Sequence, residues 1–293
     1  MTGDRANECS VCGGPTADWF AVSARTYQRC RECGLICVKE GLAKGPSGLS
    51  IYEEEDSVFL QDGNASYYLD ESNLRSCELK HRWVMRFLRP GSSLLDVGSN
   101  FGHFLKAVSP DLVGRGLELS PAAVRWGREN LGVDAHVGSA YAIPDTLRGP
   151  HDAVCLWDVI EHLEQPLLAL REAHAVLKPG GYLFLSTPDA GSFAARLLGR
   201  RWHYLDPVQH LHLFARSNLV DALQRSGFRV VVFRRFGHYY RIRYVFDRLE
   251  YLHPSHVARC LLRVLRFCCF PLLRMTAYVS LGDVMGVAAQ KVA

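Results

Sequence analysis

Strand and helix patterns alternate through the middle of this chain, and this alternation limits the fold more than any other feature. Four short apolar runs are expected to be strands, at 92–97, 112–119, 152–159 and 182–187. Helical periodicity separates or precedes them at 74–88, 101–108, 121–130 and 165–177, with a turn expected at 178–181. The alternation predicts βαβ units and a doubly wound, mostly parallel α/β sheet. Ligands of such sheets bind at the carboxyl ends of the strands.

The first of these strands runs into a glycine-containing turn, LLDVGSNFGHFL. Gly98 and Gly102 allow the backbone to approach a ligand closely, and Asp96 stands just before the turn. The spacing D-x-G-x-x-x-G differs from the G-x-G-x-x-G of dinucleotide sites, and the carboxylate favours a cationic ligand. Glu118 ends the next strand, twenty residues after Gly98, where an acid can accept both hydroxyls of a ribose.

Five segments in this order resemble the class I S-adenosylmethionine-dependent methyltransferases over roughly residues 71–236. They are LLDVGSNFG, GLELSP, HDAVCLWDVIEHLEQP, LKPGGYLFLSTP and the pair Gly227-Phe228. The third and fourth resemble the small-molecule enzymes of ubiquinone biosynthesis and sugar modification. The resemblance implies a seven-stranded sheet and methyl transfer from S-adenosylmethionine.

The resemblance also implies the residues that bind the cofactor. The amino-acid part would contact Asp96 and the turn from Gly98 to Gly102, the ribose Glu118, and the adenine Leu119. The remaining implied contacts are Ser139 and Ala140 at the adenine edge and Trp157 and Asp158 beside the methyl donor. Within the turn the family usually has glycine at Asn100, and often Cys or Gly at Ser99. Asparagine tolerates positive φ better than most residues.

Histidines are the candidates for a general base, because methyl transfer needs little more than alignment and removal of a proton. His162 lies in VIEHL and His210 in RWHYLDPVQHLHLF. The resemblance puts both segments on the acceptor side of the pocket. We therefore predict His162 and His210 as catalytic residues, ahead of His203 and His212 in the second segment.

The N-terminus predicts a different kind of site. Cys9-x2-Cys12 and Cys30-x2-Cys33 are separated by seventeen residues, and each pair is followed by glycine. Four thiolates at this spacing suit tetrahedral zinc in a closed, structural site. We predict a zinc-ribbon over 1–40 with Cys37 as a non-ligand, a connector over 41–70, and a methyltransferase domain over 71–293.

A basic stretch interrupts this last domain. Residues 229–274 contain ten arginines and two acids, against a net charge of +4 for the whole chain. We predict a helical insertion at about 240–275, between the sixth and seventh strands. In the 257–274 helix, Arg259, Arg263 and Arg266 form one stripe. This helix would pack on the sheet, join two subunits or contact an anionic membrane at its surface.

The N-terminal residues contain no apolar run, and no uncharged apolar segment of about 18 residues occurs, so we expect a cytoplasmic protein. The favoured function is methylation of a small-molecule, sugar or lipid-linked acceptor in a bacterial biosynthetic pathway. An RNA methyltransferase is one alternative, although residues 1–50 hold six basic and five acidic side chains and offer little for phosphates. A non-catalytic, cofactor-binding protein is the other.

Overall fold

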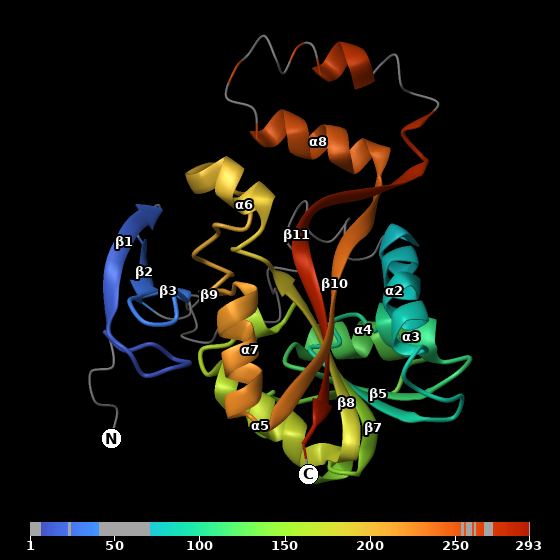
Figure 1. Ribbon diagram of the computed structural model, residues 1–293. Helices are drawn as coiled ribbons and strands as arrows, with labels where there is room; N and C mark the ends of the chain where they lie inside the picture. Colours follow the sequence, from blue (N-terminus) through green and yellow to red (C-terminus); the bar gives the residue numbers. More distant parts are fainter. Residues whose placement is uncertain are drawn as a thin grey trace.

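The computed structural model describes residues 7–22, 25–40, 71–252, 255, 260, 262–266 and 272–292. These residues form one sheet of seven strands and one of four, with helices packed around them (Figure 1). The predicted connector, 41–70, lies outside the described residues.

The large sheet has the strand order β10-β11-β8-β7-β4-β5-β6. From β8 to β6 neighbouring strands are parallel, and β11 is antiparallel to both β8 and β10. This arrangement confirms the predicted seven-stranded, mostly parallel sheet. Its strands are β4 (Ser93–Val97), β5 (Val113–Glu118), β6 (Ala135–Val137), β7 (His151–Trp157), β8 (Leu177–Pro188), β10 (Phe228–Arg241) and β11 (Thr276–Lys291).

Helices cover both faces of this sheet, because the parallel strands are apolar on both sides. One core cluster joins the sheet to α2 (Glu71–Val84) and α3 (His103–Val108) through Trp83 and Phe104. A second joins it to α5 (Pro166–Val176) and α7 (Arg216–Arg225) through Leu170 and Leu219. The layers therefore have the doubly wound arrangement expected from the sequence.

The sequence signals at helix α4 (Pro121–Leu131) act as expected. The Ser120 hydroxyl accepts a hydrogen bond from the backbone N–H of Ala123, Pro121 occupies the first turn, and Gly132 ends the helix in a left-handed conformation. The predicted turn at 178–181 is instead part of β8. Leu177 already pairs with His151 of β7, and a register shift follows between His151 and Ala153.

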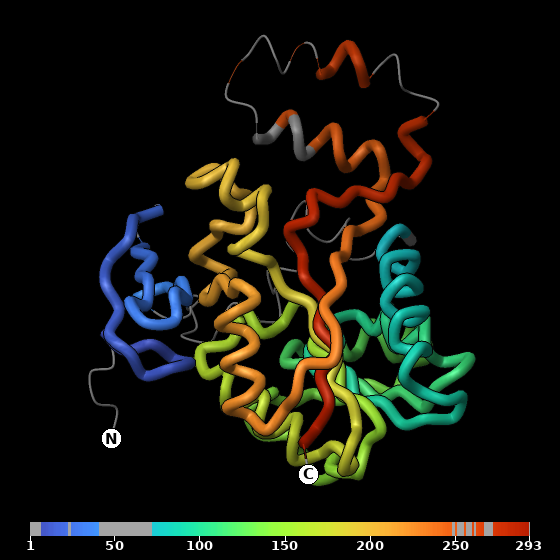
Figure 2. The backbone as a smooth tube through the Cα atoms, in the orientation of Figure 1, coloured from blue at the N-terminus to red at the C-terminus, as the bar shows by residue number. Residues whose placement is uncertain are grey.

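The small sheet joins the N-terminal segment to a two-residue strand at 212–213. Its strands are β1 (Thr16–Val22), β2 (Arg25–Cys30), β3 (Ile36–Val38) and β9 (His212–Leu213), all antiparallel. β9 belongs to the second of the histidine-containing segments, and it pairs Cys37 with His212 and Ile36 with Leu213. The smooth tube shows the N-terminal strands lying against this part of the chain (Figure 2).

The basic stretch follows β10 and leads back to β11. It begins with α8 (Ile242–Leu252), and residues 262–266 are also helical. Arg263 bonds Glu250, and Arg266 pairs with both Asp247 and Glu250. The two acids of α8 therefore neutralise part of the stripe, whose third member, Arg259, lies outside the described residues.

Among the described residues, no helix is both long enough and apolar enough to cross a membrane.

Candidate functional site

The turn after β4 has a backbone shape that depends on its residue types. Gly98 and Gly102 have φ values of +76° and +80°, and a Cβ at Gly98 would lie 2.5 Å from a methyl carbon of Val159. Asn100 also adopts the left-handed conformation, with φ of 49°, and its side-chain oxygen accepts the N–H of Phe101 at 2.8 Å. Asparagine thus fits the backbone conformation for which glycine is usual at this position.

Asp96 lies at the carboxyl end of β4 and is only 2% exposed. Burial raises the pKa of this carboxyl to about 8, against the opposing effect of Lys80. Its Oδ1 atom and the hydroxyl of Ser99 are buried, and neither has a hydrogen-bond partner among the described residues. Buried polar atoms normally have a partner, so this pair fits a ligand that brings a donor group into the turn.

Glu118 ends β5 and is also buried. Its Oε2 accepts the backbone N–H of Asn100 at 2.8 Å, and its Oε1 accepts that of Ser120 at 2.9 Å. Burial raises the pKa of Glu118, although these N–H groups favour the ionised form. The bonds fix the carboxylate at the carboxyl end of the sheet, beside the glycine turn.

The expected adenine side has three further residues, Leu119, Ser139 and Ala140. They are half-buried and lie just beyond the ends of β5 and β6. The Ser139 hydroxyl accepts the N–H of Tyr141 at 3.2 Å, and Ser139 and Ala142 form an isolated bridge. These residues line the same edge as Glu118, because β5 and β6 are parallel neighbours.

Trp157 and Asp158 end β7, next to β4. Asp158 has a φ of 56° and binds the ammonium of Lys80 at 3.0 Å through Oδ2 and the hydroxyl of Ser186 at 2.7 Å through Oδ1. Burial alone would raise the pKa of Asp158, but Lys80 holds it well below the usual range. Lys80 also lies 5.1 Å from the centre of the Trp157 ring. The partly buried ion pair ties helix α2 to the end of β7.

His162 and His210 lie together, with ring centres 5.0 Å apart. Their Nδ1 atoms approach the carbonyl oxygens of Gln209 and Tyr204 at 2.7 and 2.8 Å. Burial, followed by the neighbouring His210, lowers the pKa of His162 to about 3, and burial also lowers that of His210. Both rings are therefore neutral near pH 7, a state that binds metals well and accepts protons weakly.

The other two histidines of RWHYLDPVQHLHLF, His203 and His212, have different partners. His203 approaches Asp283 at 3.7 Å. His212 is buried in β9, and its Nε2 bonds the Ser10 hydroxyl at 2.8 Å. His212 thus belongs to the contact between β9 and the N-terminal cysteine segment.

Three side chains at this site are not among the residues predicted from the sequence: Lys80, Glu161 and Ser186. Glu161 is 1% exposed and groups with His162 and His210. It is part of the quoted segment VIEHL, so its position before His162 was the available signal. Lys80 has no local motif, because its partner Asp158 lies 78 residues away.

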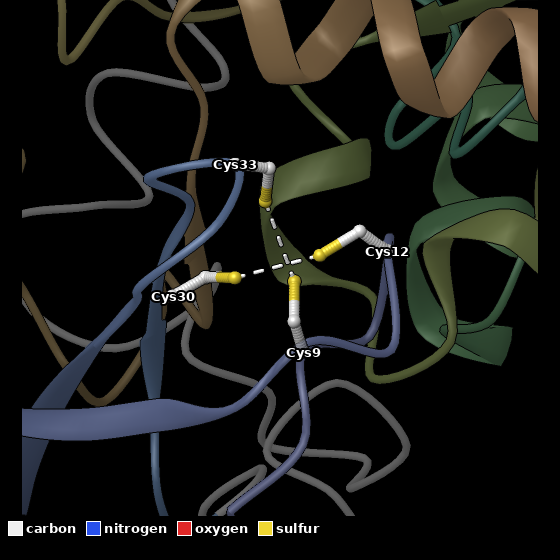
Figure 3. A group of neighbouring side chains, drawn as sticks. All are labelled: Cys9, Cys12, Cys30 and Cys33. Carbon is white, nitrogen blue, oxygen red and sulfur yellow. Dashed lines mark hydrogen bonds between the residues drawn. The ribbon is translucent and has the colours of Figure 1, made fainter.

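The predicted metal ligands also come together. The sulfur atoms of Cys9, Cys12, Cys30 and Cys33 all lie within 4.8 Å of one another (Figure 3). Cys9 and Cys33 are 3.6 Å apart and Cys12 and Cys30 3.4 Å, and all four are free thiols. Zinc–sulfur bonds of about 2.3 Å require sulfur separations of about 3.8 Å in a tetrahedron. The four-cysteine cluster, as we call this group, therefore fits one zinc ion.

Comparison with known proteins identifies the family. A family model described as a methyltransferase domain matches residues 71–232, more than half of the chain. The chain belongs to this family of methyltransferase domains.

Individual relatives match a smaller part of the chain than the family model does. The ubiquinone biosynthesis O-methyltransferase of Xanthomonas campestris pv. campestris (strain B100) is 31% identical over 148 residues, which are 44% of this chain and 62% of the relative. The chain thus matches under two thirds of that relative's length.

Two solved structures share the fold. A SAM-dependent methyltransferase from Archaeoglobus fulgidus is 20% identical, with a TM-score of 0.51, and the match covers 77% of this chain and 99% of that one. The [4+2]-cyclase SpnF is also 20% identical, with a TM-score of 0.50 over 74% of this chain and 81% of that one. At this identity the likeness shows the fold alone, and the cyclase illustrates that the fold does not fix the chemistry.

Proposed function

We propose that this protein transfers a methyl group from S-adenosylmethionine to a small-molecule, sugar or lipid-linked acceptor in a bacterial biosynthetic pathway. The observation that carries the proposal is the glycine turn with its two unpartnered buried atoms, Asp96 Oδ1 and Ser99 Oγ. The name of the Xanthomonas relative supports a hydroxyl acceptor.

The polar groups of the turn suit the cofactor's amino-acid part. Its ammonium would supply the donor that Asp96 and Ser99 lack, and a cation there returns the pKa of Asp96 toward its usual value. Gly98 and Gly102 keep side chains out of the space next to the backbone, and Asn100 completes the turn between them.

On the adenosine side we assign Glu118 to the ribose hydroxyls and Leu119, Ser139 and Ala140 to the adenine. The Asn100 and Ser120 N–H groups orient the Glu118 carboxylate before any ligand arrives. Trp157 and Asp158 face the methyl donor from the end of β7.

The acceptor side is assigned to His162 and His210, the proposed catalytic residues. The bound cofactor supplies an activated methyl group on a sulfonium, so the protein's part is to align the acceptor and to help its proton leave. His162 lies in the turn that follows β7, and the ring of His210 lies 5.0 Å from it. Because β7 is the neighbour of β4, which carries Asp96, this position suits contact with the acceptor.

The N-terminal segment is proposed to be a zinc-ribbon in which the four-cysteine cluster holds a structural zinc ion. Four thiolates leave no open position for a substrate. For the cytoplasmic protein that we propose, the Arg-rich 257–274 helix is a candidate for contact with an anionic membrane surface. The pairing of Arg263 and Arg266 with α8 reduces the charge available for it.

Turnover assays test the proposal. The full chain, incubated with S-adenosylmethionine and a panel of phenol, catechol, sugar and lipid-linked acceptors, should release S-adenosylhomocysteine with at least one of them. Asp96→Asn should weaken cofactor binding. Cofactor binding without release of S-adenosylhomocysteine from any acceptor would instead favour the non-catalytic alternative.

A further inference from the structure

His238 is a histidine outside the sequence motifs, and it lies beyond the carboxyl end of the large sheet. β11 pairs with β8 only as far as Val284 and Pro188, whereas β10 and β11 continue past this point toward α8 (Figure 1). His238 of β10 pairs with Val279 of β11 in this extension. Ligands of doubly wound sheets bind beyond the carboxyl ends of the parallel strands, so His238 lies at the end of the sheet where the acceptor is expected.

An irregularity in the two strands directs this part of the chain. The register shifts between Phe236 and His238, where the paired residue of β11 changes from Val284 to Val279. Gly237 at the shift has no room for a side chain, because a Cβ there would lie 2.3 Å from the carbonyl oxygen of Val279. Such irregularities bend a strand, re-aim its side chains and are frequent next to active sites.

Helix α2 fixes β10 directly after this histidine. The backbone N–H of Tyr239 donates to the Ser76 hydroxyl at 2.8 Å. Ser76 lies one helical turn before Lys80, and residues at this spacing share a face of a helix. Because Lys80 binds Asp158 at 3.0 Å, the hydrogen bond from β10 brings His238 close to the ion pair at the end of β7.

The surroundings of the His238 ring suit a general base. The ring is half-buried, its centre lies 5.9 Å from that of Tyr240, and no hydrogen bond to either ring nitrogen is found among the described residues. Burial lowers the pKa of His238, and the nearby Lys80 lowers it further. The carboxylates of Asp158 and Asp283 act in the opposite direction. The ring is therefore neutral near pH 7, and the two carboxylates stabilise the cation that forms when it takes a proton.

His162 and His210 are less suited to remove a proton. Their Nδ1 atoms are bonded to carbonyl oxygens, and burial lowers the pKa of His162 to about 3. A base with so low a pKa takes a proton from an ordinary hydroxyl poorly, since the best pKa for a general base lies near the working pH. These two rings are better suited to align the acceptor.

We propose that His238 is the general base of the reaction and that the acceptor atom is an un-ionised hydroxyl, that of a phenol or an alcohol. This inference rests on the proposed function and deepens it. His238 takes the hydroxyl proton on a ring nitrogen, and the oxygen forms the new O–CH3 bond. The S–CH3 bond breaks, and its electron pair stays on sulfur. The imidazolium ring then releases the proton to solvent.

Turnover of the full chain with the phenol, catechol and sugar acceptors tests the base. At pH 7, His238→Gln should lower kcat by about 100-fold or more, while calorimetry shows unchanged affinity for S-adenosylmethionine. The control is His136→Gln, at a histidine of β6 that pairs with Asp134, and it should match the wild type in both measurements. Added imidazole should restore part of the turnover of His238→Ala.

The pH profile distinguishes a base from a structural role. Because burial lowers the pKa of His238, kcat of the wild type should fall only below about pH 6.5, the usual pKa of histidine. The deficit of His238→Gln should shrink toward pH 10, where a phenol ionises without help.

Three outcomes would count against the account. A kcat of His238→Gln within a few-fold of the wild type would overturn the base alone. A deficit that is constant with pH and not relieved by imidazole would do the same, because it would indicate a structural role. Absent turnover by the wild type with every acceptor would overturn the proposed function and the base with it.

Discussion

Two groups of potential metal-ligand side chains occur among the described residues, and they differ in donor type and in surroundings. The four-cysteine cluster has four sulfur donors on two turns of the N-terminal segment, with Cys9 and Cys30 buried in the core that α7 shares. The second group, the Glu161 cluster, consists of Glu161 and His162 from the turn after β7 and His210 from the segment before β9, and its two rings are half-buried.

In each cluster, the type of donor atom fits the place of the cluster in the fold. Four sulfur donors suit zinc with a structural role, whereas two imidazole rings beside a buried carboxyl group suit contact with a polar ligand. The clusters are also connected. Ser10, between two of the cysteines, bonds His212, which lies two residues after His210. The N-terminal segment therefore contacts the stretch of chain that carries His210.

The largest effect should come from breaking the four-cysteine cluster. Cys30→Ser should abolish zinc binding and reduce the free energy of unfolding by more than about 4 kcal/mol, because the metal links two turns that share the core. Zinc analysis measures the bound metal, and chemical denaturation measures the free energy of unfolding. Cys260→Ser, at an exposed cysteine, is the control. One zinc per chain in Cys30→Ser would refute the ligand set.

The next largest effect should come from breaking the ion pair between Lys80 and Asp158. Lys80→Met leaves the half-buried Asp158 without its cation but with its Ser186 hydrogen bond, and should cost about 1–3 kcal/mol of stability at pH 7. Because the folded-state pKa of Asp158 lies below its unfolded value, this stabilisation is present above that unfolded value, about 3.9, and is lost at lower pH. The difference between variant and wild type should therefore narrow below about pH 4. Chemical denaturation of both proteins across this pH range measures the difference in free energy of unfolding. A difference that stays constant with pH would contradict the prediction.

A smaller effect should come from removing the hydrogen bond between Ser10 and His212, which connects the two parts of the molecule. Ser10→Ala removes the hydroxyl from His212 and should cost about 1 kcal/mol of stability. If the N-terminal segment positions His210, kcat should fall a few-fold while the affinity for S-adenosylmethionine is unchanged. Ser109→Ala, at an exposed serine, serves as the matched variant. Equal losses in kcat and cofactor affinity would mean that the bond supports the fold generally.

The smallest change is expected at Asn100, which lies in neither cluster. Glycine accepts the left-handed backbone of this position without strain, so Asn100→Gly loses only the local bond to Phe101. The free energy of unfolding should change by less than about 1 kcal/mol, with cofactor affinity nearly unchanged. A large gain in affinity would show that asparagine impairs the turn.

Much of the large sheet was predictable, because its strands and helices have local signals such as the Ser120-Pro121 start of α4. The cysteine spacing likewise predicted which four side chains meet. The pairing of β3 with β9 had no such signal, since a two-residue strand 175 positions further on supplies it. Glu161 and Lys80 were missed for a related reason. Their importance comes from burial and from partners distant in sequence, which a single motif does not reveal.

The most direct test of the account is calorimetric titration of the wild type and Glu118→Ala with S-adenosylmethionine. The assigned pocket predicts binding by the wild type and a loss of about 1–3 kcal/mol in the variant, roughly 5- to 150-fold in affinity, as the charged hydrogen bonds to the ribose are removed. Equal affinity in the two proteins, or no binding by the wild type, would contradict the assignment of this site.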